Sequence, residues 1–155
     1  MPTALDRPDF PSDLLPRTLV AVAMRSNAPA HLVCATAIGT ELRDALPGTT
    51  ARVLLASHCA EAPGARRVLG LTLALGRAAV TPGQHLAAYT TASFAALALG
   101  HRGRGSFLLK TALDSSGRLG ENDRFAALLC RAIYLHEATA AEYRYVAASV
   151  ALRLR

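Results

Sequence analysis

The segment from residue 84 to residue 99 most constrains how this chain can fold. It is apolar almost all the way round, with only Thr90, Thr91 and Ser93 as small polar breaks. A helix without a polar face must be buried on every side, either in a core or in a subunit interface. We therefore expect residues 84–99 to form a helix in one of those two places.

Three short runs rich in apolar residues predict strands. Residues 52–57 (RVLLAS) and 106–112 (SFLLKTA) are almost wholly apolar, which is typical of strands buried on both faces of a sheet. Residues 143–152 (YRYVAASVAL) are interpreted as a closing strand. Residues 17–24 fit either a strand or a helix.

Helical spacing of apolar residues predicts two helices before residue 80. The first covers residues 30–46 and ends at Pro47-Gly48. The second opens at Pro63-Gly64 and runs through Leu75, with Gly76 closing it.

A further helix follows the loop at residues 114–120, and Asn122 or Asp123 can cap it. Its apolar stripe consists of Phe125, Leu128, Leu129, Ala132, Ile133 and His136. The order of helices and strands predicts an α/β layered domain in which helices cover a sheet.

At 155 residues the chain fits one domain. Residues 1–16 are rich in Pro and Asp and are expected to form an extended N-terminal arm, and residues 17–155 the single α/β domain. The acidic start is wrong for a signal peptide, and no apolar run is long enough to cross a membrane. Three widely spaced cysteines, Cys34, Cys59 and Cys130, indicate free core thiols in a reducing compartment, so we expect a cytoplasmic protein.

Seventeen basic residues against eleven acidic ones give a net charge of +6. The basic residues are scattered apart from His101-Arg102-Gly103-Arg104, and aromatic residues are not interleaved with them. Nucleic acid is therefore not an expected partner. An acidic acyl carrier protein would suit such a surface.

No familiar nucleotide or metal signature is present, and we expect neither a cofactor nor a metal. The glycines of residues 100–105 follow a helix and lead into the predicted strand, the reverse of a phosphate loop. His31, His85, His101 and His136 lack metal-ligand spacing. His58 and Cys59 end a predicted strand, where active-site residues of α/β folds often lie, and form an alternative candidate site.

Residues 96–117 read A-L-A-L-G-H-R-G-R-G-S-F-L-L-K-T-A-L-D-S-S-G. This pattern resembles the centre of the β-ketoacyl synthase (thiolase-like) family, above all its short chain-length-factor-like members. In that family a strand ending T-A-C-A-S-S places the nucleophilic Cys in a strand-to-helix turn. Thr111-Ala112 match the T-A and Ser115-Ser116 match the S-S, while Leu113, followed by Asp114, stands in place of the Cys.

The resemblance implies half of a thiolase-like fold and no catalysis by the chain alone. Leu113 cannot accept an acyl group, and the family's carbonyl-binding residues come from a C-terminal half that is not expected here. The chain would then be a silent, chain-length-factor-like subunit that pairs with an active ketosynthase in polyketide, polyene or fatty-acid-type biosynthesis. The expected interface and pocket residues are Phe94, Phe107, Leu109 and Leu113.

Two alternatives remain open. One is a small stand-alone enzyme whose pocket holds His58 and Cys59, or Asp114 with Ser115 and Ser116. The other is a structural or regulatory interaction module without a small-molecule site.

Overall fold

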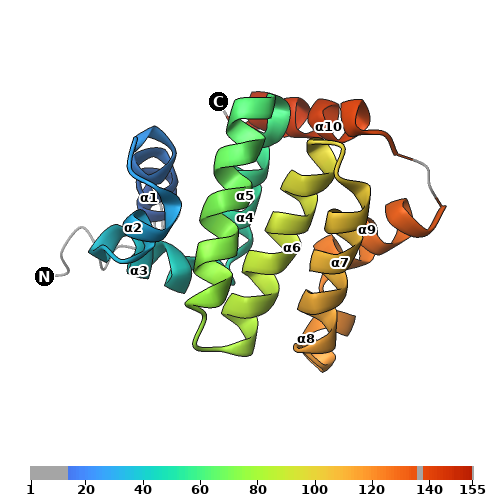
Figure 1. The fold of residues 1–155 in the computed structure, drawn as a ribbon, viewed down its shortest axis with the longest axis horizontal. Helices are drawn as coiled ribbons and strands as arrows, with labels where there is room; N and C mark the ends of the chain where they lie inside the picture. The colour runs from blue at the N-terminus through green and yellow to red at the C-terminus, as the bar shows by residue number, and fades with distance from the viewer. Residues whose placement is uncertain (1–13, 136–137, 155) are drawn as a thin grey trace, which may run out of the picture.

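The computed structural model describes residues 14–135 and 138–154, and every regular element in these two ranges is helical. Figure 1 shows the helices side by side, with no sheet among the described residues. The predicted α/β layered sheet, and with it half of a thiolase-like fold, is therefore wrong.

The N-terminal helices are α1 (Leu14–Arg25), α2 (Ala30–Cys34) and α3 (Ala37–Ala45). The helix predicted over residues 30–46 is broken in two, because Thr36 accepts a hydrogen bond from Gly39 N and starts α3 as its N-cap. A Cβ at Gly39 would lie 2.4 Å from Cys34 Cα, so this tight corner requires glycine.

Arg67 of the helix at residues 62–77 holds the C-terminal end of α1. Its guanidinium donates from Nη1 to Ala28 O (2.8 Å) and from Nη2 to Ala23 O (3.1 Å). These carbonyls belong to the last turn of α1 and the loop after it, where the helix leaves acceptors without partners of its own.

The centre of the molecule consists of α4 (Thr49–Ser57), the short 3₁₀ helix η2 (His58–Ala60), α5 (Ala62–Arg77) and α6 (Pro82–Ala98). A short loop joins α5 to α6, and the two pack side by side in opposite directions (Figure 1). The predicted stop at Pro47-Gly48 and the predicted start near Pro63-Gly64 agree with the bounds of these helices.

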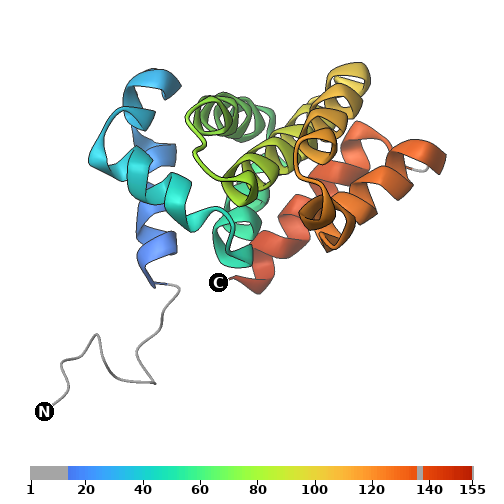
Figure 2. The same cartoon turned by 90° about the horizontal axis from the view of Figure 1, so that it is seen from below.

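The C-terminal helices are α7 (Arg102–Asp114), α8 (Arg118–Glu121), α9 (Arg124–Leu135) and α10 (Ala140–Arg153). Figure 2 shows α1–α3 at one end of the molecule and α7–α9 at the other. α10 crosses the end of the central helices and packs against α4, η2 and α6.

Helix α6 forms the middle of the core. Thirteen of its seventeen residues are buried, including Thr90, Thr91 and Ser93. Both threonine hydroxyls donate to carbonyls one turn earlier, and Ser93 Oγ donates to Gly105 O of α7 (2.7 Å). Burial of these hydroxyls therefore leaves none of them without a partner. The predicted buried helix is confirmed, and it lies in the core of this chain.

The three predicted strands are helical. Residues 52–57 lie in α4, residues 106–112 in α7 and residues 143–152 in α10. The buried positions of α7 are Gly105, Leu108, Leu109 and Ala112, which follow the helical spacing i, i+3, i+4, i+7. A short apolar run does not distinguish a buried strand from one face of a helix, and Ala and Leu favour the helix.

The ends of other predicted segments shift as well. α1 begins at Leu14, so the last three residues of the expected 1–16 arm are helical, and residues 1–13 lie outside the described part of the chain. The expected loop at residues 114–120 contains the start of α8. Throughout residues 14–135 and 138–154, no helix combines the length and apolar character needed to cross a membrane.

Candidate functional site

The position matched to a nucleophilic Cys is near the end of α7. Leu113 is the second-last residue of this helix and is followed by Asp114 and Ser115. The family's turn would place it at a helix N-terminus, whose positive end lowers the pKa of a thiol. The C-terminal end of α7 has the opposite polarity, so this position does not reproduce the environment of the family's nucleophile.

The two serines after Leu113 differ in their surroundings. Ser116 is buried and donates to Ala112 O. Ser115 is exposed, donates to Thr111 O (2.8 Å) and lies 2.9 Å from His85 Nδ1. Thr111 Oγ1 in turn donates to Phe107 O. These hydroxyls therefore bond to the end of α7 itself.

The contact between Ser115 and His85 is the only serine–histidine hydrogen bond in the described part of the chain. Burial lowers the pKa of His85, which favours a neutral imidazole at pH 7. A serine nucleophile also needs donors that stabilise an oxyanion, and carbonyls surround a helix C-terminus instead. The geometry therefore fits a cross-link between α6 and α7 better than a catalytic pair.

His58 and Cys59 lie in η2 and do not form a reactive pair. Cys59 is 0% exposed, and its Sγ lies 3.8 Å from Leu55 O. Burial raises the pKa of this thiol to about 12, so it stays protonated at neutral pH. His58 is exposed at the surface, and burial of the remaining part of its side chain lowers its pKa. Cys59 is therefore a core residue.

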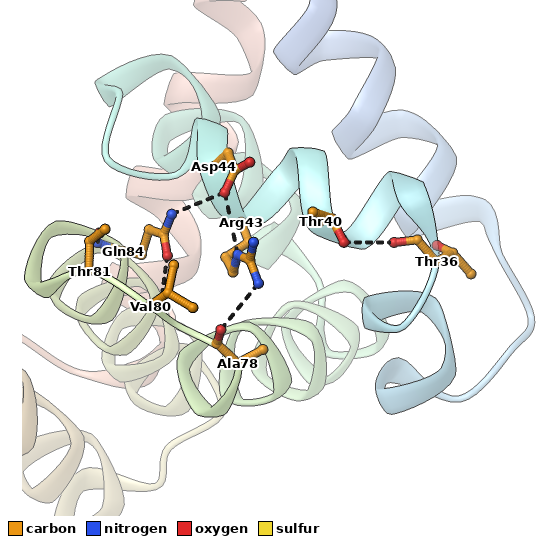
Figure 3. Close-up of polar contacts among 8 residues, drawn as sticks. All are labelled: Thr36, Thr40, Arg43, Asp44, Ala78, Val80, Thr81 and Gln84. Atoms are coloured by element: carbon orange, nitrogen blue, oxygen red, sulfur yellow. Dashed lines mark hydrogen bonds and ion pairs between the residues drawn. The ribbon is translucent and has the colours of Figure 1, made fainter.

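A polar cluster ties α3 to the loop before α6, as Figure 3 shows. Gln84 Nε2 donates to Asp44 Oδ1 (3.0 Å), and Val80 N donates to Gln84 Oε1 (2.9 Å). Arg43 Nη1 donates to Ala78 O (3.3 Å) from the same part of α3. Both the Nε2 donor and the Oε1 acceptor of the buried Gln84 amide are thus hydrogen-bonded within the protein. The cluster holds the α5–α6 turn in place.

A largely buried ion pair holds the start of α9. Arg52 Nη1 lies 2.8 Å from Asp123 Oδ2, and the two side chains are only 11% and 9% exposed. Asp123 Oδ1 accepts from Ala126 N (2.8 Å), which confirms the predicted helix cap. Asp123 therefore pairs with Arg52 of α4 and also caps the first turn of α9. The ion pair has a structural role.

A first apolar groove lies between α7 and α9. Its volume is about 360 Å³, and its lining residues are Ser106, Leu109, Lys110, Leu113, Asp114, Cys130, Ile133 and Tyr134. Leu109 and Leu113 form its α7 wall, with Lys110 and Asp114 on the same helix. The groove thus brings Leu109, Leu113 and Asp114 together.

A second apolar groove lies between α9 and α10, with α6 beneath it. Its volume is about 330 Å³, and its lining residues are Phe94, Phe125, Leu128, Leu129, Ala132, Ala138, Glu142, Tyr143 and Val146. We call it the α9/α10 groove. Glu142 is its only charged lining residue, and Leu128 on its α9 side is 68% exposed. The groove therefore presents an apolar surface to solvent.

Three aromatic rings form the inner part of the α9/α10 groove. The Phe94 ring lies 5.8 Å from that of Phe125 and 5.9 Å from that of Tyr143, measured between centroids. Arg52 lies 5.9 Å from the Phe125 centroid and adds a cation–π contact to the base of α9. Because these contacts come from α4, α6, α9 and α10, the inner surface of the groove is preformed.

The structure separates the four residues that the sequence suggested for an interface or pocket. Phe94 lines the α9/α10 groove, whereas Leu109 and Leu113 line the groove between α7 and α9. Phe107 lines neither and is 68% exposed on α7.

Sequence reasoning missed the α10 side of the α9/α10 groove, because residues 143–152 were interpreted as a strand. It also placed Leu128 in a helical stripe without indicating that this position is exposed. Within residues 14–135 and 138–154, no group of three or more His, Cys, Asp or Glu side chains is placed to hold a metal ion.

Comparison of the chain with protein-family models, with curated proteins and with solved structures found no match. No relative therefore supplies a function. The resemblance to ketosynthases stays a prediction based on short motifs.

Proposed function

We propose that the chain is a non-catalytic interaction module that docks a partner polypeptide in the α9/α10 groove. The observation that carries the proposal is the exposed apolar face of α9 next to a preformed aromatic floor. Leu128 and Val146 stand on opposite sides of the groove and are 68% and 51% exposed. These exposed apolar side chains flank one groove, and we assign the partner to the surface between them.

The groove also has the makeup of a protein interface. The rings of Phe94 and Tyr143 are only 5% and 7% exposed, so they shape the base of the groove while the exposed contact area comes from Leu128 and Val146. Charged groups are nearly absent from its lining, as is usual for the buried centre of an interface. Glu142, the one charged lining residue, already accepts a hydrogen bond from Thr139 N in the α10 capping box.

The predicted ketosynthase partner stays a prediction, but its structural basis changes. In the ketosynthase-like fold that the resemblance implies, the pairing would use the edge of a sheet at the strand over residues 106–112, but these residues form part of α7. Any contact with a ketosynthase would have to use a helical surface instead. The acidic acyl carrier protein also stays a prediction. A cytoplasmic location would be compatible with both partners.

The proposal is tested with two matched surface variants. Leu128 and Phe107 are both 68% exposed, but only Leu128 lines the α9/α10 groove. Leu128→Glu and Phe107→Glu therefore add the same charge at equally exposed apolar positions. Wild-type protein and both variants are used as bait in extract of the source cell, and captured proteins are identified by mass spectrometry.

A captured protein then has to be purified and mixed with the chain, and the mass of the complex determined after size-exclusion chromatography. We expect a defined stoichiometric complex with wild type and with Phe107→Glu, and loss of that complex with Leu128→Glu. Equal binding by both variants would contradict the proposed docking site. A ketosynthase, tested by coexpression in the same way, is one candidate for the partner.

A further inference from the structure

The inference that follows rests on the proposed function and names the partner chemistry of the same site. We propose that the α9/α10 groove receives an amphipathic helix whose apolar face is flanked by acidic residues. This inference rests on three features: the shape of the groove, the backbone chemistry of its walls and the basic residues beside Leu128.

The walls of the groove restrict the conformation of what binds there. Both walls are helices, whose backbone groups are hydrogen-bonded internally, so they offer no sheet edge to an extended peptide. A segment entering an apolar groove must then satisfy its own backbone N–H and C=O groups. A helix does this without help from the groove.

The α9 wall of the groove extends over two turns of that helix. Its α9 wall consists of Phe125, Leu128, Leu129 and Ala132, which follow the spacing i, i+3, i+4, i+7. These seven residue steps cover about 10 Å, or two helical turns. A partner helix with three or four apolar anchors at the same spacing would cover this wall.

The charges beside the groove favour an acidic partner. Arg124 and Arg131 are exposed and lie four residues before and three residues after Leu128, on its side of α9. No ion pair involves either residue within the described ranges. Each guanidinium is therefore available to a carboxylate on the rim of a bound helix.

The one acidic lining residue, Glu142, offsets only part of the charge of these two arginines. Glu142 Oε2 lies 3.2 Å from Thr139 N and closes the capping box of α10. Its carboxylate is thus engaged at the first turn of α10, on the wall opposite α9. The outer side of α9 keeps a net positive charge, consistent with the +6 of the whole chain.

The experiment uses two synthetic helical peptides with the same leucines at i, i+3, i+4 and i+7. One carries Glu and the other Lys at the positions flanking the leucines. Binding of each labelled peptide to the full chain is measured by fluorescence anisotropy at low and at high salt. We expect the acidic peptide to bind at least about tenfold more tightly at low salt, with a smaller ratio at high salt.

Charge-matched variants locate the effect. The double variant Arg124→Ala/Arg131→Ala should reduce the ratio between the two peptides to about threefold or less. Arg25→Ala/Arg66→Ala removes two exposed arginines from α1 and α5 and should leave the ratio unchanged. Circular dichroism of every variant verifies that the helices remain folded.

Several results would overturn the inference. Equal binding of both peptides, or the same loss of selectivity in the Arg25/Arg66 control, would reject an acid-selective rim at α9. If neither peptide binds while a natural partner is lost with Leu128→Glu, the docking site stands and the proposed partner chemistry fails.

Discussion

Helices α6 and α9 are both rich in Ala and other apolar residues, yet α6 is mostly buried and α9 is mostly not. Thirteen residues of α6 are buried, because α4, α5, α7 and α10 all pack against it. α9 contacts mainly α7 and, less extensively, α6, and buries only Ala126 and Leu129 among its described side chains. In Figures 1 and 2 it lies at the outer side of the molecule.

The difference teaches that apolar composition does not by itself fix where a helix lies. α6 is apolar on all sides and has neighbours on all sides, so its apolar surface is used within the chain. α9 has an apolar stripe wider than its neighbours cover. The surplus surface on α9 is what we assign to a partner, and the predictions below test the contrast between the two helices.

The largest contrast is expected in thiol reactivity. Cys59 is buried in the core, whereas Cys130 lines the groove between α7 and α9. Cys59 should react only through unfolding, so its rate should be at least about 1000-fold below that of Cys130. The two rates are measured with a maleimide in single-cysteine variants, with the other cysteines replaced by serine. Rates within tenfold of each other would show that η2 opens locally.

The second prediction breaks the attachment of α9. Asp123→Ala removes the N-cap and leaves Arg52 as a buried charge whose Nε already lacks a partner. The free energy of unfolding should fall by about 3–5 kcal/mol, as measured by urea denaturation. Glu121→Ala, at an exposed acidic position two residues earlier, should change it by less than about 0.5 kcal/mol. Similar losses in both variants would reject a structural role for the ion pair.

The third prediction compares the same truncation on the two helices. Leu97 of α6 is buried and lies against Gly105, where a Cβ would come within 2.6 Å of its side chain. Leu97→Ala should cost about 2–5 kcal/mol in the free energy of unfolding. Leu128→Ala should cost less than about 0.5 kcal/mol, since that side chain is mostly exposed. A large loss at Leu128 would mean that α9 is a core element after all.

The smallest effect concerns pH. Burial raises the pKa of Cys59 from its usual value of 9.0 to about 12 in the folded state. The folded protein therefore holds this proton while the unfolded chain releases it, so stability is lost as pH rises above 9. The expected loss is about 1 kcal/mol between pH 9 and pH 10. Cys59→Ala should remove this component, and an unchanged pH dependence in that variant would assign it to other groups.

The sequence predicted the helical segments best where a long pattern or a cap defined them. Residues 84–99 and Asp123 are examples, because a fully apolar helix and a side-chain cap are local features. The three strands were wrong because six to ten residues of apolar sequence fit both a buried strand and a helix. In α7 the buried positions Gly105, Leu108, Leu109 and Ala112 follow helical spacing, whereas the short apolar run at residues 106–112 by itself predicts a strand.

The candidate site was less predictable than the helices. Leu109 and Leu113 lie four residues apart on one helix face, and so do Lys110 and Asp114, so their grouping follows from a correct helix assignment. The α9/α10 groove joins residues from α6, α9 and α10, and only tertiary packing brings them together. The sequence predicts Phe94 at an apolar interface or pocket, while its contacts with Phe125 and Tyr143 depend on the packing of α9 and α10 against α6.

Native-state amide hydrogen exchange, resolved to single residues, tests the contrast between α6 and α9 most directly. We predict that α6 exchanges only through global unfolding, and that α9 exchanges at a clearly lower free energy of opening. The acidic helical peptide should then slow exchange in α9 and the first turns of α10. Equal protection of α6 and α9 in the free protein, with no change on adding the peptide, would contradict a closed core beside an open docking groove.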